Sequence, residues 1–307
     1  MLEIIRPDTK FDFLGVRRWA VGVSLFVIAA SFASVMVRGL NYGIDFAGGT
    51  MVHLRFPKPV EIGDIRAALG DAGAGDVTVQ DFGGSSNEFM VRMPESDPEL
   101  KKGLAKRISS ALSGRFGGEG AFEVLRVESV GPRVGSELRR RAFLAVTAAT
   151  LMMGLYIALR FDIRFGIGAA AALIHDVIVT VGALSLFGYE FDLNIVAALL
   201  TIVGFSVNDT VIISDRVREN MRKSRREAVE AIFNRSINET LSRTILTTGT
   251  ALFVILALYV LGGEIIRGFA FALLVGFIAG TYSTVFIAGA VVLAMEPRHR
   301  STSARAA

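Results

Sequence analysis

Residues Leu193–Asn220 read LNIVAALLTIVGFSVNDTVIISDRVREN. The segment opens as an apolar run long enough to cross a bilayer, and a charged cluster starts at Asp215. Six residues before that cluster lie Asn208 and Asp209. An ionisable side chain at this depth costs several kcal/mol unless it faces a partner or water, so we interpret Asp209 as a functional acid. The alternative is an aspartate that only pairs with a neighbouring helix and stabilises the bundle.

The composition of the whole chain is that of a membrane protein. Of its 307 residues, 52% are hydrophobic, and the mean hydropathy is +0.50. There is no cysteine, and the three histidines are scattered, so we expect no metal site and no cofactor. No nucleotide-binding loop is present, which argues against an enzyme. Six segments approach the ~20 residues that a spanning helix needs: Trp19–Val37, Ala142–Leu159, Phe165–Leu186, Leu193–Ser214, Thr244–Leu261 and Phe269–Leu293.

The distribution of lysine and arginine predicts the topology. Basic residues concentrate in both tails and in the loops after the second and fourth spans, as cytoplasmic segments do. We therefore predict that both tails, 1–18 and 297–307, are cytoplasmic. The first span covers 19–37, and the other five spans lie within 142–296. The segment between the first two spans, 38–141, is predicted to lie outside. Because topology accounts for the net charge of +4, we predict no nucleic-acid binding. The first span is interpreted as an uncleaved anchor, the alternative being a processed signal peptide.

The outer segment 38–141 has the pattern of a small α+β domain. Its strand-like runs alternate with helical periodicity in the order βαββαβ, which is the ferredoxin-like arrangement. The strands are predicted at Thr50–Phe56, Val77–Phe82, Glu88–Met93 and Phe122–Val130, and the helices at Glu61–Ala72 and from Asp97 onward. No catalytic constellation is visible, so this domain is interpreted as a docking module. The predicted fold class is thus an α-helical integral membrane protein with six transmembrane helices and a ferredoxin-like domain between the first two.

Two glycine-containing stretches flank the outer domain. They are GIDFAGG at Gly43–Gly49 and GPRVGSEL at Gly131–Leu138. Glycine permits unusual backbone angles and close approach, so these stretches are candidate hinges that couple the domain to the helices; a plain linker is the alternative. The candidate coupling residues are Gly43, Asp45, Gly48, Gly49, Gly131, Pro132 and Gly135.

Asp209 requires a counter-charge, and Arg243 on the fifth helix is the candidate. If that helix begins near Ile237, both residues lie roughly 9 Å inside their antiparallel helices, at ~1.5 Å per residue. A carboxylate that alternates between an arginine and a proton can be the moving part of a proton relay. The alternatives are a static salt bridge, or Arg243 bound instead by Glu239 at i−4.

Other polar residues of the spans are weaker candidates. His175 and Asp176 form either a local hydrogen-bonded unit or a second titratable station, and Ser206, Asn208 and Thr210 either bond across helices or line a wet path. Gly276 and Gly280 form a GxxxG pair for close helix packing. The apolar stripe of 225–237 predicts an amphipathic helix on the cytoplasmic interface, opened by a capping box at Ser224–Glu227.

Several stretches together resemble the SecF side of the SecD/SecF family, accessory membrane subunits of the bacterial protein-export translocase. They occur in the family's order and span nearly all of the chain: GIDFAGG at Gly43–Gly49, VGPRVGSEL at Val130–Leu138, His175-Asp176, SVNDTVIISDRVREN at Ser206–Asn220, INETLSRT at Ile237–Thr244 and GTYS at Gly280–Ser283. One departure is Phe205, where the family commonly has tyrosine.

The resemblance implies more than these residues show. Such subunits are related to the resistance-nodulation-division transporters and pair with SecD into a twelve-helix assembly beside the SecYEG channel, with YajC as a further partner. The assembly acts on translocating, unfolded polypeptide at the bacterial inner membrane, with its outer domains in the periplasm. It is driven by the proton gradient, and the aspartate and arginine corresponding to Asp209 and Arg243 are linked to proton transport. The alternatives are a small-molecule or lipid exporter and a non-transporting translocon scaffold.

Overall fold

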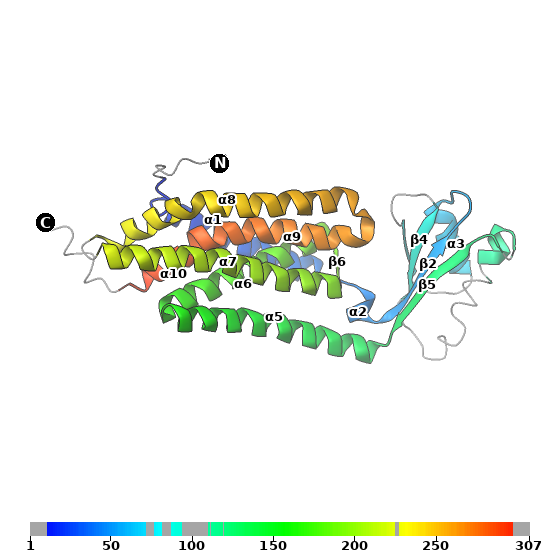
Figure 1. Ribbon diagram of the computed structural model, residues 1–307. Coiled ribbons are helices and arrows are strands. Elements are labelled where there is room, and N and C mark those ends of the chain that lie inside the picture. Colours follow the sequence, from blue (N-terminus) through cyan, green and yellow to red (C-terminus); the bar gives the residue numbers. More distant parts are fainter. Residues whose placement is uncertain are drawn as a thin grey trace.

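The computed structural model describes residues 11–71, 77–81, 87–93, 110, 112–118, 120–224 and 227–296. In these ranges, six helices are long and apolar enough to cross a membrane, and a small sheet domain lies beyond one end of their bundle (Figure 1). The helices are α1 (Arg17–Arg38), α5 (Pro132–Arg160), α6 (Ile163–Phe187), α7 (Leu193–Lys223), α8 (Val229–Leu261) and a last span built from α9 (Gly263–Ser283), the π-helical turn η1 (Thr284–Ala288) and α10 (Gly289–Ala294). The predicted fold class is confirmed.

Three of the spans form the interior of the bundle. Within the 18-residue apolar stretch of each span, the share of residues buried inside the protein is 50% for α6, 56% for α7 and 61% for the last span, against 17% for α1 and for α8. Small residues allow the inner helices to approach closely: a Cβ on Gly168 of α6 would lie 2.8 Å from the carbonyl oxygen of Ala288 in η1. Large apolar side chains such as Phe26 and Phe253 are exposed on the outer helices, as expected where a helix faces lipid.

The outer domain is a four-stranded antiparallel sheet with helix α3 (Ile62–Asp71). Its strands are β2 (Gly49–Arg55), β3 (Thr78–Asp81), β4 (Glu88–Met93) and β5 (Glu123–Val130), in the order β3-β4-β2-β5. This order places the first strand of the domain between the third and the fourth, as the ferredoxin-like arrangement requires. Alternate residues such as Leu54 and Val91 are buried against Ile65 and Leu69 of α3.

Some predicted segments lie outside the described residues. They include most of the second helix of the outer domain from Asp97, most of the turn at 83–87, residues 1–10 of the N-terminal tail and the C-terminal tail 297–307.

The prediction of a separate amphipathic helix at 225–237 is wrong. Residues 225–226 lie outside the described part of the chain, and α8 runs without a break from Val229 through the span. Its apolar stripe is buried against protein: Phe233 stacks on Phe165 of α6 at a centroid distance of 5.8 Å. The predicted capping box also fails, because Ser224 ends α7 and the helix that follows begins after Ala228 without a side-chain cap. The physical reason is that a helical apolar stripe suits a protein core as well as a membrane surface.

Residues 11–16 before α1 add to this packing. The backbone N–H groups of Phe11 and Phe13 donate to the side-chain oxygens of Asn238 and Asn234 on α8, at 2.9 and 2.8 Å. Leu14 is 1% exposed within the same apolar cluster. The start of α8 is therefore held by the segment that precedes α1.

Candidate functional site

A buried carboxylate joins three inner helices. Asp176 of α6 is 0% exposed. Its Oδ2 accepts hydrogen bonds from the hydroxyl groups of Ser206 on α7 at 2.8 Å and Ser283 on α9 at 2.9 Å, and its Oδ1 lies 3.0 Å from Nδ1 of His175. Polar groups inside a bilayer must find partners within the protein, so these bonds hold α6, α7 and α9 together at one level.

Together with further hydroxyl groups, the contacts of Asp176 form a connected set of polar side chains across the bundle, here called the polar seam. Thr210 of α7 pairs with Thr284 of η1 at 3.2 Å, and Thr248 of α8 pairs with Thr281 of α9 at 3.1 Å. Tyr282 stacks on the His175 ring and donates to the carbonyl oxygen of Ala20 in α1 at 2.7 Å. The seam therefore connects α1, α6, α7, α8 and the last span.

The sequence did not lead us to predict that hydroxyl groups of the last span belong to this seam. Four consecutive hydroxyl side chains, Thr281 to Thr284, interrupt an otherwise apolar span, and this run was the available signal. The backbone changes from α- to π-helical at Thr284. Single π-helical turns occur frequently at functional sites, where they re-aim side chains.

Asp209 lies one turn from Ser206 on α7. Its side chain is 1% exposed, and neither carboxylate oxygen has a hydrogen-bond partner among the described residues. The hydroxyl of Thr244 on α8 is likewise buried without a partner. A buried carboxylate without a partner is costly in its charged form, so Asp209 requires a proton or an approaching cation.

The predicted ion pair between Asp209 and Arg243 is not formed in this structure. Arg243 is the charged group that acts electrostatically on Asp209, but no nitrogen–oxygen contact within 4.0 Å joins them, and the arginine side chain is exposed. The alternative partner, Glu239, is also not bound to Arg243: it accepts hydrogen bonds from Arg216 at 2.6 Å and Asn220 at 2.7 Å. The spacing along the two helices predicted an equal depth for Asp209 and Arg243, but the first side chain is buried and the second is exposed.

The exposed side of α7 near this acid carries an unusual stripe for a membrane-spanning helix. Thr201, Gly204 and Asn208 are spaced three and four residues apart, and all three are exposed. Of the predicted polar supports, Ser206 and Thr210 thus point into the bundle, whereas Asn208 points out of it. Small and polar residues at this depth are typical of a surface that another helix covers.

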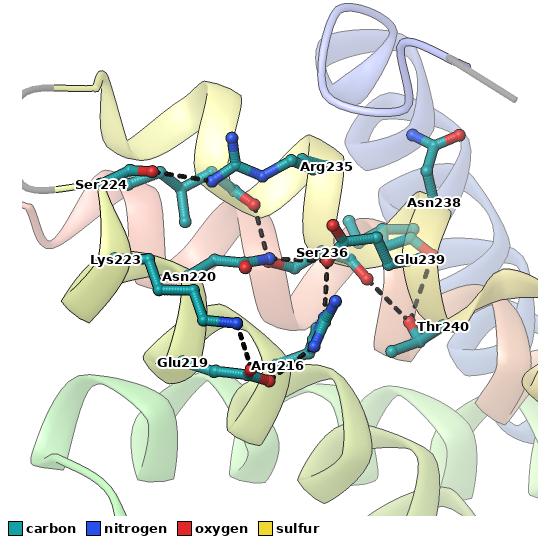
Figure 2. Close-up of polar contacts among 12 residues, drawn as sticks. Arg216, Glu219, Asn220, Lys223, Ser224, Arg235, Ser236, Asn238, Glu239 and Thr240 are labelled. Carbon is teal, nitrogen blue, oxygen red and sulfur yellow. Dashed lines mark hydrogen bonds and ion pairs between the residues drawn. The ribbon is translucent and has the colours of Figure 1, made fainter. Parts of the chain in front are cut away.

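Beyond the membrane level, α7 and α8 are joined by a polar network (Figure 2). Arg216 bridges Glu239 and Glu219, in each case at 2.6 Å. Asn220 donates to Glu239 and to the fully buried hydroxyl of Ser236, the latter at 3.0 Å. This network fixes the corner at which α7 ends and α8 begins.

At the opposite end of the bundle, the GIDFAGG segment forms a packed junction. Strand β1 (Asn41–Tyr42) pairs in parallel with β6 (Glu190–Phe191), the short strand that precedes α7. The N–H of Gly43 donates to the carbonyl oxygen of Phe191 at 2.9 Å. The short helix α2 (Ile44–Ala47) follows, and Asp45 accepts a hydrogen bond from the N–H of Leu193 at 3.1 Å. The start of α7 is thereby bound to the entrance of the outer domain.

The second flank packs against the first. Gly48 has φ +78°, and a Cβ there would lie 2.9 Å from Cα of Pro132, the first residue of α5. A Cβ on Gly135 would lie 3.0 Å from the carbonyl oxygen of Phe46. Gly49 pairs with Val130 between β2 and β5, directly before Gly131, the residue that precedes α5. These glycines therefore allow the backbones of the two flanking segments, 43–49 and 130–135, to lie in close contact.

An ion pair adds a side-chain connection between the domain and the bundle. Arg92 of β4 donates to Glu190 of β6, and their side chains are 18% and 29% exposed. The sheet is thus connected by a side-chain contact to the residues that precede α7.

Gly276 and Gly280 lie where α9 crosses α7. A Cβ on Gly276 would lie 2.2 Å from Cδ1 of Ile202, and one on Gly280 would lie 3.2 Å from Cβ of Ser206. The close approach at Gly280 is what brings Ser283 and Ser206 to the same carboxylate.

These features define a class: a multi-pass membrane protein whose six-helix bundle buries an ionisable site and is mechanically joined to an outer domain. Residues 114–298 match the family described as "Protein export membrane protein SecD/SecF, C-terminal", and residues 33–60 match the "SecD/SecF GG Motif". The chain belongs to the SecD/SecF family of protein export membrane proteins.

Individual relatives agree. The chain is 45% identical to the protein translocase subunit SecF of Desulfurispirillum indicum, over 94% of this chain and 92% of the relative. It is 42% identical to SecF of Escherichia coli O157:H7, over 92% and 87%. The crystal structure of SecDF from Thermus thermophilus superposes with a TM-score of 0.82 at 38% identity, over 95% of this chain and 39% of that one. A SecDF structure in a super-membrane-facing form gives a TM-score of 0.70 at 39% identity, over 98% and 40%.

The chain therefore spans nearly the whole length of the SecF relatives and about two fifths of the SecDF chains. The predicted membership is confirmed, and with it a role as an accessory subunit of the protein translocase.

Proposed function

We propose that this chain is the SecF half of a proton-driven machine that promotes late steps of protein translocation. It works in the bacterial inner membrane, with both termini in the cytoplasm and the outer domain in the periplasm. The proton gradient is its energy source, and no cofactor is needed. The observation that carries this proposal is Asp209, a buried carboxylate without a hydrogen-bond partner among the described residues, with the exposed Arg243 within electrostatic reach.

Two states of Asp209 follow from this geometry. A proton neutralises the carboxyl and permits the arrangement seen here, in which the acid has no cationic contact. When the proton leaves, the carboxylate attracts the guanidinium of Arg243, which must turn inward to reach it. Because the residues lie on α7 and α8, each exchange changes the force between these two helices.

The junction provides the path from the bundle to the outer domain. Asp45 is bonded to the first turn of α7, and Glu190 is paired with Arg92 of the sheet. A small shift of α7 therefore acts on the outer domain through contacts already in place. Asp176 supports this motion as a polar clamp that keeps α6, α7 and α9 in register.

A partner helix is required by the exposed stripe of Thr201, Gly204 and Asn208 and by the exposed Arg243. The two similar crystal structures are those of SecDF, which supports a SecD chain as that partner. The SecYEG channel, YajC and the unfolded polypeptide in transit are the further partners that the family resemblance implies.

Replacing Asp209 with Asn tests the relay. The change keeps the size of the side chain and removes its titration, so export under an imposed proton gradient is expected to fall to the level without a gradient. Asp215→Asn is the matched control, because it makes the same chemical change at an exposed position six residues further along α7. If the Asp209 variant retains its response to the gradient, the relay is excluded and a scaffold role remains.

A further inference from the structure

A cleft of about 580 Å³ opens near the ends of the spans opposite the outer domain. It lies between the turn that joins α5 to α6, the last turns of α7 and the first turns of α8. Arg164, Arg218 and Arg222 contribute its basic side chains, and Phe161, Met221 and Val229 are among its apolar ones. The carboxylate of Asp162 also lines the cleft, which thus combines three arginines and one acid with an apolar wall.

Two of these arginines have no acidic partner among the described residues. Arg164 is bound by Asp162 and Glu296, and the hydrogen bond from Arg164 holds the pKa of the Asp162 carboxyl below its usual range. Arg218, by contrast, donates to the carbonyl oxygen of Arg160 at 3.3 Å, and Arg222 forms no ion pair with any residue of the described ranges.

The nearby acid of α7 does not compensate for them. Glu219 is occupied by Arg216 and Lys223, each at 2.6 Å. Arg218 and Arg222 lie four residues apart on one face of α7, where like charges repel. An anion bound between them would remove this repulsion.

The position of the cleft indicates the kind of anion. Leu159, 80% exposed, and Ile163, 67% exposed, flank the α5–α6 turn and mark where the lipid-facing surface ends. The apolar wall would contact the parts of a ligand below its charged group. Basic pockets between transmembrane helices on the cytoplasmic side are suited to acidic lipid headgroups.

We propose that this cleft binds the headgroup of an anionic phospholipid. Arg218 and Arg222 contact the phosphate, and Phe161, Met221 and Val229 contact the glycerol and the first part of the acyl chains. The bound lipid joins the α5–α6 turn to α7 and α8, beside the network of Arg216, Glu239 and Asn220. It therefore stabilises the corner against which α7 and α8 move.

The test measures lipid binding by the full chain purified from membranes. Native mass spectrometry and thermal unfolding are recorded with added phosphatidylglycerol, phosphatidylcholine or pyrophosphate. Phosphatidylglycerol is expected to be retained and to raise the melting temperature, whereas phosphatidylcholine and pyrophosphate do neither. Arg218→Gln with Arg222→Gln is expected to weaken phosphatidylglycerol binding roughly thirtyfold, since each basic residue near an anionic headgroup contributes about 1 kcal/mol and 1.4 kcal/mol corresponds to a factor of ten.

The control pair is Arg18→Gln with Lys223→Gln, which removes the same charge from the same end of the bundle but outside the cleft. It is expected to bind phosphatidylglycerol as the unchanged chain does. The single variant Arg222→Gln alters one exposed side chain and is expected to show an intermediate loss even if the double variant does not fold. Equal losses in the control pair, an unchanged affinity in the Arg222→Gln variant, or an equal effect of pyrophosphate would each overturn the proposal.

Discussion

Asp176 provides a test that separates the structural and the titrating roles of a buried acid. Asp176→Asn retains an oxygen that can accept from both Ser206 and Ser283, and it presents an amide N–H to Nδ1 of His175. Asp176→Ala removes all three interactions and leaves two hydroxyl groups buried without their acceptor. The two variants differ in hydrogen bonding, yet both lack an ionisable group.

The expected magnitudes follow from the number of bonds. A side-chain hydrogen bond inside a membrane bundle contributes about 0.6 to 1.7 kcal/mol, so the loss of three costs roughly 2 to 5 kcal/mol. For the Ala variant this corresponds to a fall in melting temperature on the order of 10 °C. The Asn variant is expected to change the melting temperature by no more than a few degrees. Ser283→Ala, which removes one bond of the three, is expected to lie between them.

Thermal unfolding of the full chain in one detergent measures these effects, and export under an imposed gradient measures function. If Asp176 is a clamp, the Asn variant exports normally. If the Asn variant is stable but no longer responds to the gradient, Asp176 is a second titrating station and the clamp interpretation is wrong. An Ala variant as stable as the unchanged chain would refute the structural reasoning itself.

Three further changes test the packing and the outer domain. Gly48→Ala is expected to lower the melting temperature of the chain more than Gly39→Ala does. Both glycines have positive φ, which costs alanine about 1–3 kcal/mol, but a new Cβ would lie within 3 Å of other backbone only at Gly48. Equal losses in the two variants would show that the junction is not tightly packed. Gly276→Ala is expected to cost about 1–3 kcal/mol through its clash with Ile202, and Ile202→Ala in the same chain should recover part of the melting temperature. The hydrogen bond from Arg55 lowers the pKa of the Glu88 carboxyl below its usual value. The stability that this bond adds to the folded domain is therefore present above the usual pKa of glutamate, and it is lost as the pH falls through the lowered pKa. Glu88→Gln should therefore weaken the loss of outer-domain stability at acidic pH, measured as the melting temperature by circular dichroism at a series of pH values. An unchanged dependence on acidic pH would contradict this.

Much of the architecture was predictable from the sequence, because hydropathy and periodicity are local properties. A run of about 20 apolar residues must form a helix in a bilayer, whatever surrounds it. The strand pattern of the outer domain is also local, because the alternation of apolar and polar residues specifies which face of each strand is buried. GIDFAGG was identified as a candidate junction because its glycines permit unusual backbone angles and close backbone approach. Its contacts with Phe191 and Pro132 could not be predicted, since they involve residues far away in the chain.

Tertiary structure alone decided which polar side chains meet. Sequence spacing gives the depth of a residue along its helix, at ~1.5 Å per residue, but not the direction in which its side chain points relative to neighbouring helices. Asp209 and Arg243 were matched in depth, yet one is buried and the other exposed. Asp176, the weaker candidate by sequence, receives hydroxyl groups from two other helices. The packing of the whole bundle sets the rotation of each helix about its axis. That rotation places Asp176 among hydroxyl groups of two other helices, and it leaves Asp209 buried without a hydrogen-bond partner among the described residues.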